Sequence, residues 1–466
     1  MAFLQFPEGF QWGAAAASYQ VEGAYNEDDR GLSIWDTYAH QPGRVQDGDT
    51  GDVACDHYHR YKDDVALMAR LGLQTYRFSV SWSRIFPYGR GPVNEKGLAF
   101  YDRLIDELLA HNIQPALTLY HWDLPQALQD LGGWANRDIA GYFTDYAEVM
   151  YRRFGDRVSR WITLNEPYIF TMFGHRHAFM APGIKDIGIT ARAIHHALLA
   201  HGQAVQAFRA SGVKGEIGIT NSNSSYEPAD DSPETAVAVE LARDFDSRLF
   251  HGPVFGKGYP ASVLKYYAER GAPLPIERGD MDAIASPTDF LGVNLYSRQR
   301  VMADPSSGTG FRDAPPTLPL LPMGYEMAPH SLGDFVRWVT KEYDRPKIYI
   351  TENGVCDNTV PEDGVINDDT RIDLLGGFLA GLYGAIRDGC DVRAYYQWSL
   401  MDNFEWSYGF SKRFGMVYTD FATQERILKA SAAMYSEVIR RNGLDAAEEL
   451  TRPGPAPRGA WSRIGG

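Results

Sequence analysis

Short apolar runs alternate along the chain with longer segments in which apolar residues recur every three or four positions. Seven of the short runs are rich in β-branched and aromatic residues and predict strands over residues 75–80, 115–120, 161–165, 216–220, 290–296, 347–351 and 393–398. An eighth strand is expected over residues 11–17, although this run consists mostly of Gly and Ala, which form strands poorly.

The longer segments have the spacing of amphipathic helices. Between residues 97 and 112, for example, Leu98, Tyr101, Leu104 and Leu108 fall on one helical face. Similar patterns cover residues 60–71, 139–154, 191–209 and 372–387. The strands are apolar with little alternation, as in a parallel sheet that helices cover on both sides. About eight such units without a Gly-rich nucleotide turn predict an α/β fold, a single (β/α)8 TIM barrel with long βα loops, rather than a doubly wound sheet.

The domain organisation follows from this pattern more than from length. A chain of 466 residues would suggest about three domains, but one barrel accounts for residues 1–450. The Pro-, Gly- and Ser-rich stretch 303–329 resembles an interdomain linker, yet the alternation of strands and helices resumes after it, which favours a long loop. Residues 451–466, with three Pro and four Gly, are expected to form a loosely ordered C-terminal tail.

Charge and cysteine content exclude several classes of partner. The 45 Lys and Arg residues against 60 Asp and Glu residues give a net charge of −15 without a basic run, so nucleic acid is not an expected partner. No window reaches the roughly 18 apolar residues of a membrane span, and no signal-peptide pattern opens the chain. Three widely spaced cysteines indicate neither a disulfide framework nor a zinc site. We therefore expect a cytoplasmic protein with reduced thiols, as a monomer or a homo-oligomer.

Polar and aromatic residues collect at the ends of the predicted strands. In chain order these ends carry Arg77, His121-Trp122-Asp123, Asn165-Glu166, Asn221, Asn294 with Tyr296, Glu352-Asn353, and Trp398. The carboxyl ends of the strands of a barrel meet at one rim, where barrel enzymes place their active sites. Convergence on one pocket is the simplest interpretation of so many hydrogen-bonding groups.

Two of these residues, Glu166 and Glu352, are carboxylates that directly follow apolar runs. A proton-donating carboxyl group that faces an ionised one is the catalytic pair that glycoside hydrolysis requires. A single glutamate at a strand end more often caps a helix or forms an ion pair. Two in one barrel, beside Asn165 and Asn353, favour hydrolysis.

Sugar binding also explains part of the aromatic content of 10 Trp, 27 Tyr and 23 Phe, because a pyranose stacks on aromatic rings while its hydroxyls need polar partners. Most of these rings are expected to pack the core, but the segment 397–410 interleaves two Trp with Gln, Asp, Asn and Glu. The motifs HExxH, GxSxG, GxGxxG and the Walker phosphate loop are absent. The pairs His57/His59, His175/His177 and His195/His196 lack acidic or thiol companions, so neither a metal nor a cofactor is predicted.

Several motifs in a fixed order resemble glycoside hydrolase family 1, the retaining β-glucosidases and β-glycosidases. They are FQWGAAAASYQVEGA (10–24), YHWDLPQAL (120–128), WITLNEP (161–167), APGIKD (181–186), LGVNLY (291–296), YITENG (349–354), MDNFEW (401–406) and SKRFG (411–415). The resemblance covers residues 6–439, and it implies a double-displacement mechanism through a covalent glycosyl-enzyme.

The resemblance also implies the roles of individual residues. Glu166 would be the general acid/base on the fourth strand and Glu352 the nucleophile on the seventh, with carboxyl groups about 5–5.5 Å apart. Arg77 and Tyr296 would favour the Glu352 anion, and the Glu352 charge would raise the pKa of Glu166. The terminal sugar would be bound by Gln20, His121, Trp122, Asn165, Asn294, Tyr296, Trp398, Glu405 and Trp406, with Arg77 and Phe414 in support.

Some positions restrict the range of expected substrates, and others do not. Glu405 stands where 6-phospho-β-glycosidases carry Ser, and its carboxylate would repel a phosphate. Tyr168 and the segment 175–183 depart from the family pattern on the leaving-group side, where Phe170, Phe173, Phe179, Phe414 and Asn221 are candidates for lining the site. The prediction is an exo-β-glucosidase acting on cellobiose, short cello-oligosaccharides or aryl β-glucosides. The alternatives are β-galactosidase or β-fucosidase specificity, or a sugar-binding protein without catalysis.

Overall fold

The computed structural model describes residues 1–455, and its centre is a closed ring of parallel strands. The ring strands are β2 (Gln11–Ala15), β3 (Thr75–Ser79), β4 (Gln114–Tyr120), β5 (Arg160–Asn165), β6 (Glu216–Pro228), β7 (Phe290–Asp304), β9 (Ile348–Asn353) and β10 (Val392–Trp398). Each pairs in parallel with its neighbours, and the β6–β7 and β10–β2 pairings complete the circle. The predicted (β/α)8 barrel is confirmed, including the Gly- and Ala-rich first strand.

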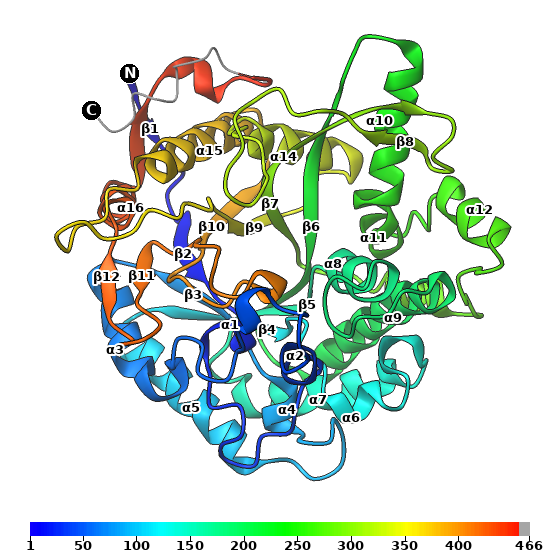
Figure 1. Ribbon diagram of the computed structural model, residues 1–466, viewed down its shortest axis with the longest axis horizontal. Helices are drawn as coiled ribbons and strands as arrows, with labels where there is room; N and C mark the ends of the chain where they lie inside the picture. The colour runs from blue at the N-terminus through cyan, green and yellow to red at the C-terminus, as the bar shows by residue number, and fades with distance from the viewer. Residues whose placement is uncertain (456–466) are drawn as a thin grey trace.

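Helices surround the ring, as Figure 1 shows. The long ones are α3 (His57–Arg70), α5 (Glu95–Ala110), α7 (Ile139–Phe154), α9 (Ile187–Ser211), α10 (Pro233–Phe245), α14 (Ser331–Glu342), α15 (Asp369–Arg387) and α16 (Ala430–Arg441). The five helices predicted from periodicity correspond to α3, α5, α7, α9 and α15. Local signals set their ends: Asp186 caps α9 by accepting from the Ile189 amide at 2.7 Å, and Gly212 ends it at φ 73°.

Shorter elements fill the loops between strands and helices. They are α1 (Ser18–Val21), α2 (Ile34–Ala39), α4 (Trp82–Ile85), α6 (Gln126–Gln129), α8 (Pro167–Thr171), α11 (Ser247–Val254), α12 (Ala261–Glu269), α13 (Asp280–Ile284), the hairpin β11 (Val417–Thr419) with β12 (Arg426–Leu428), and single turns of 3-10 or π helix.

Strands β6 and β7 are longer than the predicted runs 216–220 and 290–296. Beyond the barrel they continue side by side as a ribbon, and β8 (Gly310–Asp313) adds to β7 in antiparallel fashion. The polar sequence after Thr220 has no apolar alternation, yet backbone pairing continues, and Val301 packs beside Val239 and Ala242 of α10. The stretch 303–329 is thus part of a long βα loop, as predicted.

The two ends of the described chain lie side by side. Strand β1 (Ala2–Gln5) pairs antiparallel with β13 (Gly443–Ala446), as the blue and red strands of Figure 1 show. Thr451 is buried, its carbonyl accepts from Arg337 at 2.9 Å, and the Gly454 amide donates to Asp334 at 2.9 Å. The rest of the predicted tail, residues 456–466, lies outside the described residues.

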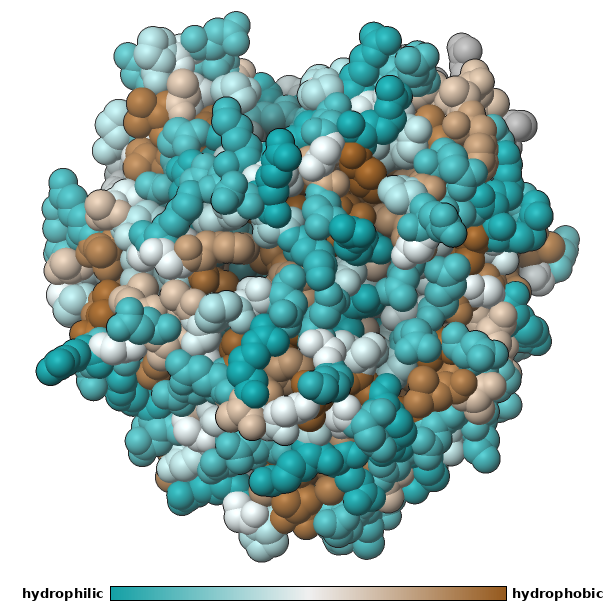
Figure 2. All heavy atoms as spheres, turned by 180° about the vertical axis from the view of Figure 1, so that it is seen from behind, coloured by the Kyte–Doolittle hydropathy of each residue, from teal (hydrophilic) through white to brown (hydrophobic). Residues whose placement is uncertain are grey.

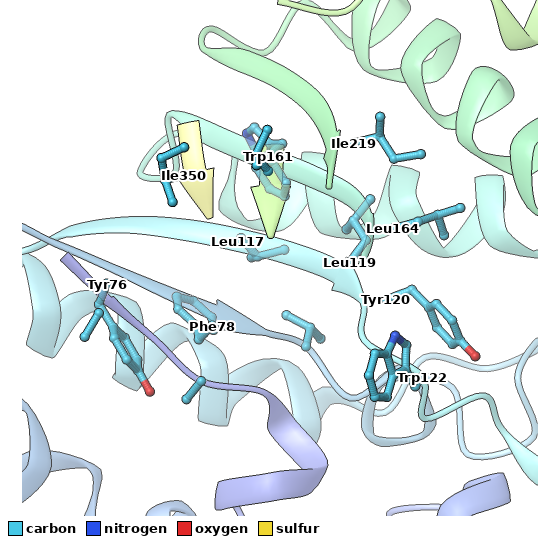
Figure 3. Packing of buried hydrophobic residues seen from close by; sticks show 14 of the residues in the cluster. Tyr76, Phe78, Leu117, Leu119, Tyr120, Trp122, Trp161, Leu164, Ile219 and Ile350 are labelled. Atoms are coloured by element: carbon cyan, nitrogen blue, oxygen red, sulfur yellow. The ribbon is translucent and has the colours of Figure 1, made fainter. Parts of the chain in front are cut away.

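The core runs between the ring and the helices. Figure 3 shows Leu117 of β4 and Trp161 of β5, which are register partners on neighbouring strands, and Trp12, Trp35, Trp82 and Trp134 are also fully buried elsewhere. The face in Figure 2 is mostly hydrophilic with small separated apolar patches. No helix of residues 1–455 has the length and apolar character that crossing a bilayer requires.

Candidate active site

The two predicted carboxylates lie at the same end of the barrel. Glu352 is the fifth residue of β9, the seventh ring strand. Glu166 follows β5, the fourth ring strand, and stands at the N-terminal end of α8 with φ 49°. A left-handed conformation costs a residue other than glycine about 1–2 kcal/mol, and such conformations concentrate at functional sites.

Glu352 is held as an anion by two donors. The Arg77 guanidinium donates from Nη1 to Oε1 at 2.6 Å, and the Tyr296 hydroxyl donates to Oε2 at 2.7 Å. The pKa of Glu352 is raised overall, because the effect of burial exceeds the lowering by Arg77 and Tyr296. Because Arg77 is itself fully buried and ion-paired here, the ionised form of Glu352 neutralises an otherwise unpaired buried charge.

Glu166 has the opposite environment. Asn294 Nδ2 donates to its Oε1 at 2.9 Å, and among the described residues no cation forms an ion pair with it. Burial and the negative charge of Glu352 raise the pKa of Glu166 well above its ordinary value. When one proton is shared between the two carboxyl groups, it therefore resides on Glu166.

A polar network beneath the carboxyl groups fixes the amides. Asn165 Oδ1 accepts from Arg77 Nη2 at 2.6 Å and from Asn294 Nδ2 at 3.1 Å, while Thr351 donates to Asn294 Oδ1 at 2.7 Å. Since Arg77 can only donate, the Asn165 amide nitrogen must face His121 Nε2, 3.0 Å away.

The same network sets the state of His121. Its Nε2 accepts from Asn165, so a neutral ring carries its proton on Nδ1, and Nδ1 has no hydrogen-bond partner among residues 1–455. Burial and Arg77 lower the pKa of His121 well below its ordinary value. The ring is therefore neutral and keeps an N–H donor free for a ligand.

Aromatic rings form the walls. The His121 ring is nearly parallel to those of Trp398 and Trp406, at centroid distances of 5.8 and 6.0 Å. Trp122, which Figure 3 places just beyond Tyr120 of β4, lies 4.6 Å from Trp406 and donates to the Asn165 carbonyl at 2.9 Å. Both Trp122 and Trp406 have positive φ, 79° and 51°.

Glu405 completes the set. It is partly accessible through the cavity, yet desolvation and the Glu352 charge raise its pKa to about 8, with Gln20 opposing this shift. Gln20 is buried and donates to Asn403 Oδ1 at 3.0 Å and the Phe404 carbonyl at 2.8 Å, and its own Oε1 has no partner in the part of the chain that the structure describes.

A cavity of about 240 Å³ lies among these groups. Of the predicted site residues, those that line it are His121, Trp122, Glu166, Tyr296, Glu352, Trp398, Glu405, Trp406 and Phe414. Arg77, Asn165 and Asn294 lie behind this lining and hydrogen-bond to its residues, and Gln20 donates to the carbonyl of Phe404, the residue before Glu405. All the predicted residues are thus brought together, in two layers.

The mouth of the cavity was predicted only in part. Phe173 and Phe179 line it as anticipated, but Phe170 packs on Tyr120 and Trp134 instead, and Asn221 is buried outside it. The sequence reasoning did not identify Ile169, Met180, Ser222, Met323, Tyr325 and Tyr408 as lining residues. Met323 and Tyr325 belong to the long loop, whose sequence has no periodic signal.

The histidine pairs have structural partners. His57 is bonded to Asp64 at 2.8 Å, and His195 to Asp280 at 2.8 Å. Within residues 1–455, no three His, Cys, Asp or Glu side chains converge as metal ligands.

Comparisons with known proteins agree with this geometry. The model of glycosyl hydrolase family 1 matches residues 3–444. A β-glucosidase A of Thermotoga maritima is 47% identical over 96% of this chain and 100% of the relative, and a 1,4-β-D-glucan glucohydrolase of Thermotoga neapolitana is 47% identical over 94% and 99%. The structure of the Thermotoga maritima family 1 enzyme with a cyclophellitol analogue superposes with a TM-score of 0.92 at 46% identity, covering 96% of this chain and 100% of that one. A match of this extent, on a barrel that brings two carboxyl groups with different partners together, means that the chain belongs to glycosyl hydrolase family 1 and is a glycoside hydrolase.

Proposed function

We propose that the protein is a retaining exo-β-glucosidase that releases terminal β-D-glucosyl residues. The observation that carries this proposal is the asymmetry of the two carboxyl groups. Arg77 and Tyr296 bind Glu352 at 2.6 and 2.7 Å, whereas Glu166 has only the amide of Asn294. One group is prepared to attack as an anion and the other to donate a proton.

In the first step Glu352 attacks the anomeric carbon while Glu166 donates its proton to the glycosidic oxygen. The bond from the anomeric carbon to that oxygen breaks, the leaving group departs as an alcohol, and an α-linked glycosyl-enzyme forms. In the ester Glu352 carries no charge, so the Coulombic contribution that raises the Glu166 pKa disappears.

In the second step Glu166, now ionised, accepts a proton from water. The water oxygen bonds to the anomeric carbon, the ester bond to Glu352 breaks, and Glu166 regains its proton. Two inversions give net retention, for which the two carboxyl groups need a separation of about 5–5.5 Å.

The polar residues around the cavity would recognise one sugar. We assign Asn165 to the 2-hydroxyl, Trp398 to the stacking surface, and Gln20, His121, Glu405 and Trp406 to the 3-, 4- and 6-hydroxyls. The free Nδ1–H of His121 and the unpartnered Oε1 of Gln20 are suited to such hydrogen bonds. A site that meets hydroxyls with buried polar groups rejects sugars that lack them.

The surroundings of the mouth support β-glucans and aryl glucosides as substrates. Phe173, Phe179 and Met180 offer an apolar wall to an aryl group. A second, more polar chamber of about 450 Å³ shares Ser222, Tyr296 and Tyr325 with the cavity and has room for further glucosyl units. The relative named 1,4-β-D-glucan glucohydrolase agrees with cellobiose and short cello-oligosaccharides, and thus with a role in cellulose degradation.

A 6-phosphorylated sugar fits this site poorly. Glu405 is acidic and lies near the negative charge of Glu352. A phosphate on the 6-hydroxyl would meet the negative charge of Glu352, and it would make the ionisation of Glu405 still less favourable, without a cation among the residues that line the cavity.

Replacing the nucleophile tests the mechanism. Glu352→Gly should abolish turnover of an aryl β-glucoside, and azide should restore it by forming the α-glucosyl azide, because the small anion occupies the vacated face. In the wild type, proton NMR should show β-glucose as the first product. Formation of the β-azide, or of α-glucose first, would contradict the assignment.

Specificity for galactose or fucose is a second candidate. Both Gln20 and Glu405 can hydrogen-bond a 4-hydroxyl of either configuration, which is the observation in its favour. A panel of kcat/KM values over aryl gluco-, galacto-, fuco- and mannosides and cellobiose distinguishes the two. No release from any aryl β-glycoside would instead favour a non-catalytic sugar-binding protein.

We also propose a cytoplasmic location. The thiols of Cys55, Cys356 and Cys390 are buried and unpaired, which suits a reducing compartment. Fractionation of the producing cells tests this, and activity in the medium or in an oxidising compartment would overturn it.

A further inference from the structure

A buried charged pair lies behind the segment that carries Glu405 and Trp406. Asp402 belongs to that segment, and Lys429 immediately precedes α16. Both side chains are fully buried, and Lys429 Nζ donates to Asp402 Oδ1 at 2.8 Å. Burying two charges is costly even when they are paired, so this arrangement is not explained by stability alone.

Asp402 is the centre of a larger set of contacts. Besides Lys429, its carboxylate accepts from Arg413 Nη1 at 2.8 Å and from the Gly415 amide at 2.9 Å. Its backbone amide donates to the Val417 carbonyl at 2.8 Å. Gly415 packs so closely that a Cβ there would lie 2.0 Å from the Asp402 nitrogen. The main chain at residue 402 is thus fixed from several directions.

These contacts lead directly to the sugar-binding groups. The next residue, Asn403, donates to the Ser399 hydroxyl and the Met401 carbonyl, each at 3.0 Å, and accepts from Gln20 at 3.0 Å. Gln20 in turn donates to the Phe404 carbonyl at 2.8 Å, one residue before Glu405. The chain of bonds therefore runs from Lys429 through Asp402 and Asn403 to Gln20.

We propose that Asp402 and Lys429 are positioning residues for substrate specificity, which hold segment 401–406 so that Gln20, Glu405 and Trp406 meet the 4- and 6-hydroxyls of the terminal sugar. This inference rests on the proposed β-glucosidase function. Neither residue lines the cavity, so both act through their neighbours. Burial lowers the pKa of Lys429 to about 8, with Arg371 acting in the same direction and Asp402 opposing it, so the amine is charged at neutral pH.

The pair is far from the groups assigned to the 2-hydroxyl and to the chemistry. Asn165, Glu166 and Glu352 are held instead by Arg77, Asn294 and Tyr296, which contact neither Asp402 nor Lys429 through hydrogen bonds. Removing the Asp402–Lys429 ion pair should therefore weaken recognition of the 4- and 6-hydroxyls and leave recognition of the 2-hydroxyl unchanged.

The test compares wild type and Lys429→Met on 2,4-dinitrophenyl β-D-glucoside and its 2-deoxy, 4-deoxy and 6-deoxy analogues. For each protein, the penalty of a missing hydroxyl is the ratio of kcat/KM values. We expect the 4-deoxy and 6-deoxy penalties to shrink about tenfold in the variant, because the partners of those hydroxyls are displaced. The 2-deoxy penalty should stay within about twofold.

Two further variants keep the test decisive. Lys429→Arg retains a cation and should retain most of the wild-type penalties. Asp402→Asn removes the other member of the pair and should show the same reduced 4-deoxy and 6-deoxy penalties, so it replaces Lys429→Met in the test if Lys429→Met does not fold. Asp280→Asn is the matched control, because it removes the acidic partner of Arg137 and His195 at 2.5 and 2.8 Å in a remote cluster. It should lower thermal stability and leave every penalty unchanged.

The outcomes separate this inference from the proposed function. An active wild type with unchanged 4-deoxy and 6-deoxy penalties in Lys429→Met and Asp402→Asn overturns the positioning role, and so does an equal decrease of all three penalties. A wild type that hydrolyses no glucoside overturns the proposed function itself.

Discussion

Three glutamates share one pocket, and their neighbours decide which of them carries a proton. Glu352 has a guanidinium and a phenol within hydrogen-bonding distance, and Glu166 has an amide, whereas the pKa of Glu405 is raised by burial and the Glu352 charge and is lowered only by Gln20. All three lose solvation, so the difference in proton affinity arises from these partners. The division of roles between chemically identical side chains is therefore a property of position.

The raised pKa of Glu166 sets the sign of the pH dependence. Glu166 must be protonated to act as the acid, so kcat/KM should fall as pH rises through its pKa. Glu166→Gln should remove this alkaline limb and reduce kcat/KM for poor leaving groups by about 10²–10⁴-fold. Activated 2,4-dinitrophenyl glucoside should lose least in the glycosylation step. Pre-steady-state kinetics over pH 5–9 measure both effects, and an equal loss for all leaving groups would contradict the acid role.

Glu405 should lower the free energy of unfolding at alkaline pH, because its carboxyl group is desolvated in the site. Its folded-state pKa of about 8 lies above the ordinary glutamate value of 4.5, so the stability associated with its protonated form is fully present below pH 4.5 and is lost as pH rises to 8. Glu405→Gln should therefore be more stable than wild type at pH 8, by about 2–3 kcal/mol, and close to it at pH 4.5. Urea unfolding at both pH values measures this. A difference that is independent of pH would argue against a raised pKa.

At the scale of elements, the ribbon of β6 and β7 decides the shape of the leaving-group side. Arg298, on β7, donates to Glu227 at 2.6 Å, to Glu326 at 3.0 Å and to Thr317 at 2.7 Å. Glu326 also accepts from the amides of Thr317 and Leu318. One buried guanidinium thus connects the ribbon to the loop that carries Met323 and Tyr325.

Arg298→Met should disturb the chamber without affecting the chemistry. Glu227 and Glu326 would lose a buried partner, and the loop would keep only its hydrogen bond from Ser297 and the β8 pairing as connections to β7. We expect the ratio of kcat/KM for cellotriose to that for cellobiose to fall about five- to tenfold, with little change for an aryl glucoside. Arg312→Met is the matched control, since Arg312 is about half exposed and its polar contacts are weak, with the Asp304 carboxylate at 3.9 Å and the Asp313 carbonyl at 3.5 Å. The same ratio in both variants would place the longer substrates elsewhere.

At the scale of the whole molecule, one asparagine joins the two ends of the barrel domain. Asn442 follows α16 with φ 47°, and its side chain accepts from Trp12 Nε1 at 2.8 Å and donates to the carbonyls of Phe6 and Pro7 at 3.0 and 3.1 Å. The first ring strand is thereby fixed against the last helix, far from the active site.

Asn442→Ala should lower the free energy of unfolding by about 2–4 kcal/mol, from lost hydrogen bonds of about 1 kcal/mol each and the left-handed conformation. The value of kcat should not change. Asn112→Ala is a control for the conformation alone, because Asn112 has φ 59° and is exposed. Chemical denaturation measures both, and equal losses would show that the Asn442 side-chain bonds contribute nothing.

The sequence by itself determined the order of strands and helices and the identity of the reacting groups. Apolar runs and three- to four-residue spacings depend on near neighbours in the chain, so each ring strand and five long helices were predicted from local pattern. Glu166 and Glu352 stand at strand ends, and a parallel ring must bring strand ends together. The sequence after Thr220 is polar and has no apolar pattern, so the predicted strand ended at residue 220, although β6 continues to Pro228.

Only the tertiary structure decided how those groups are tuned. Arg77 and Glu352 are 275 positions apart and meet because the ring closes. The free Nδ1 of His121, the loop residues Met323 and Tyr325 at the mouth, and the Asp402–Lys429 pair likewise depend on contacts between distant segments. Burial and charge at a site are sums over everything that surrounds it, and these sums exist only once the chain has folded.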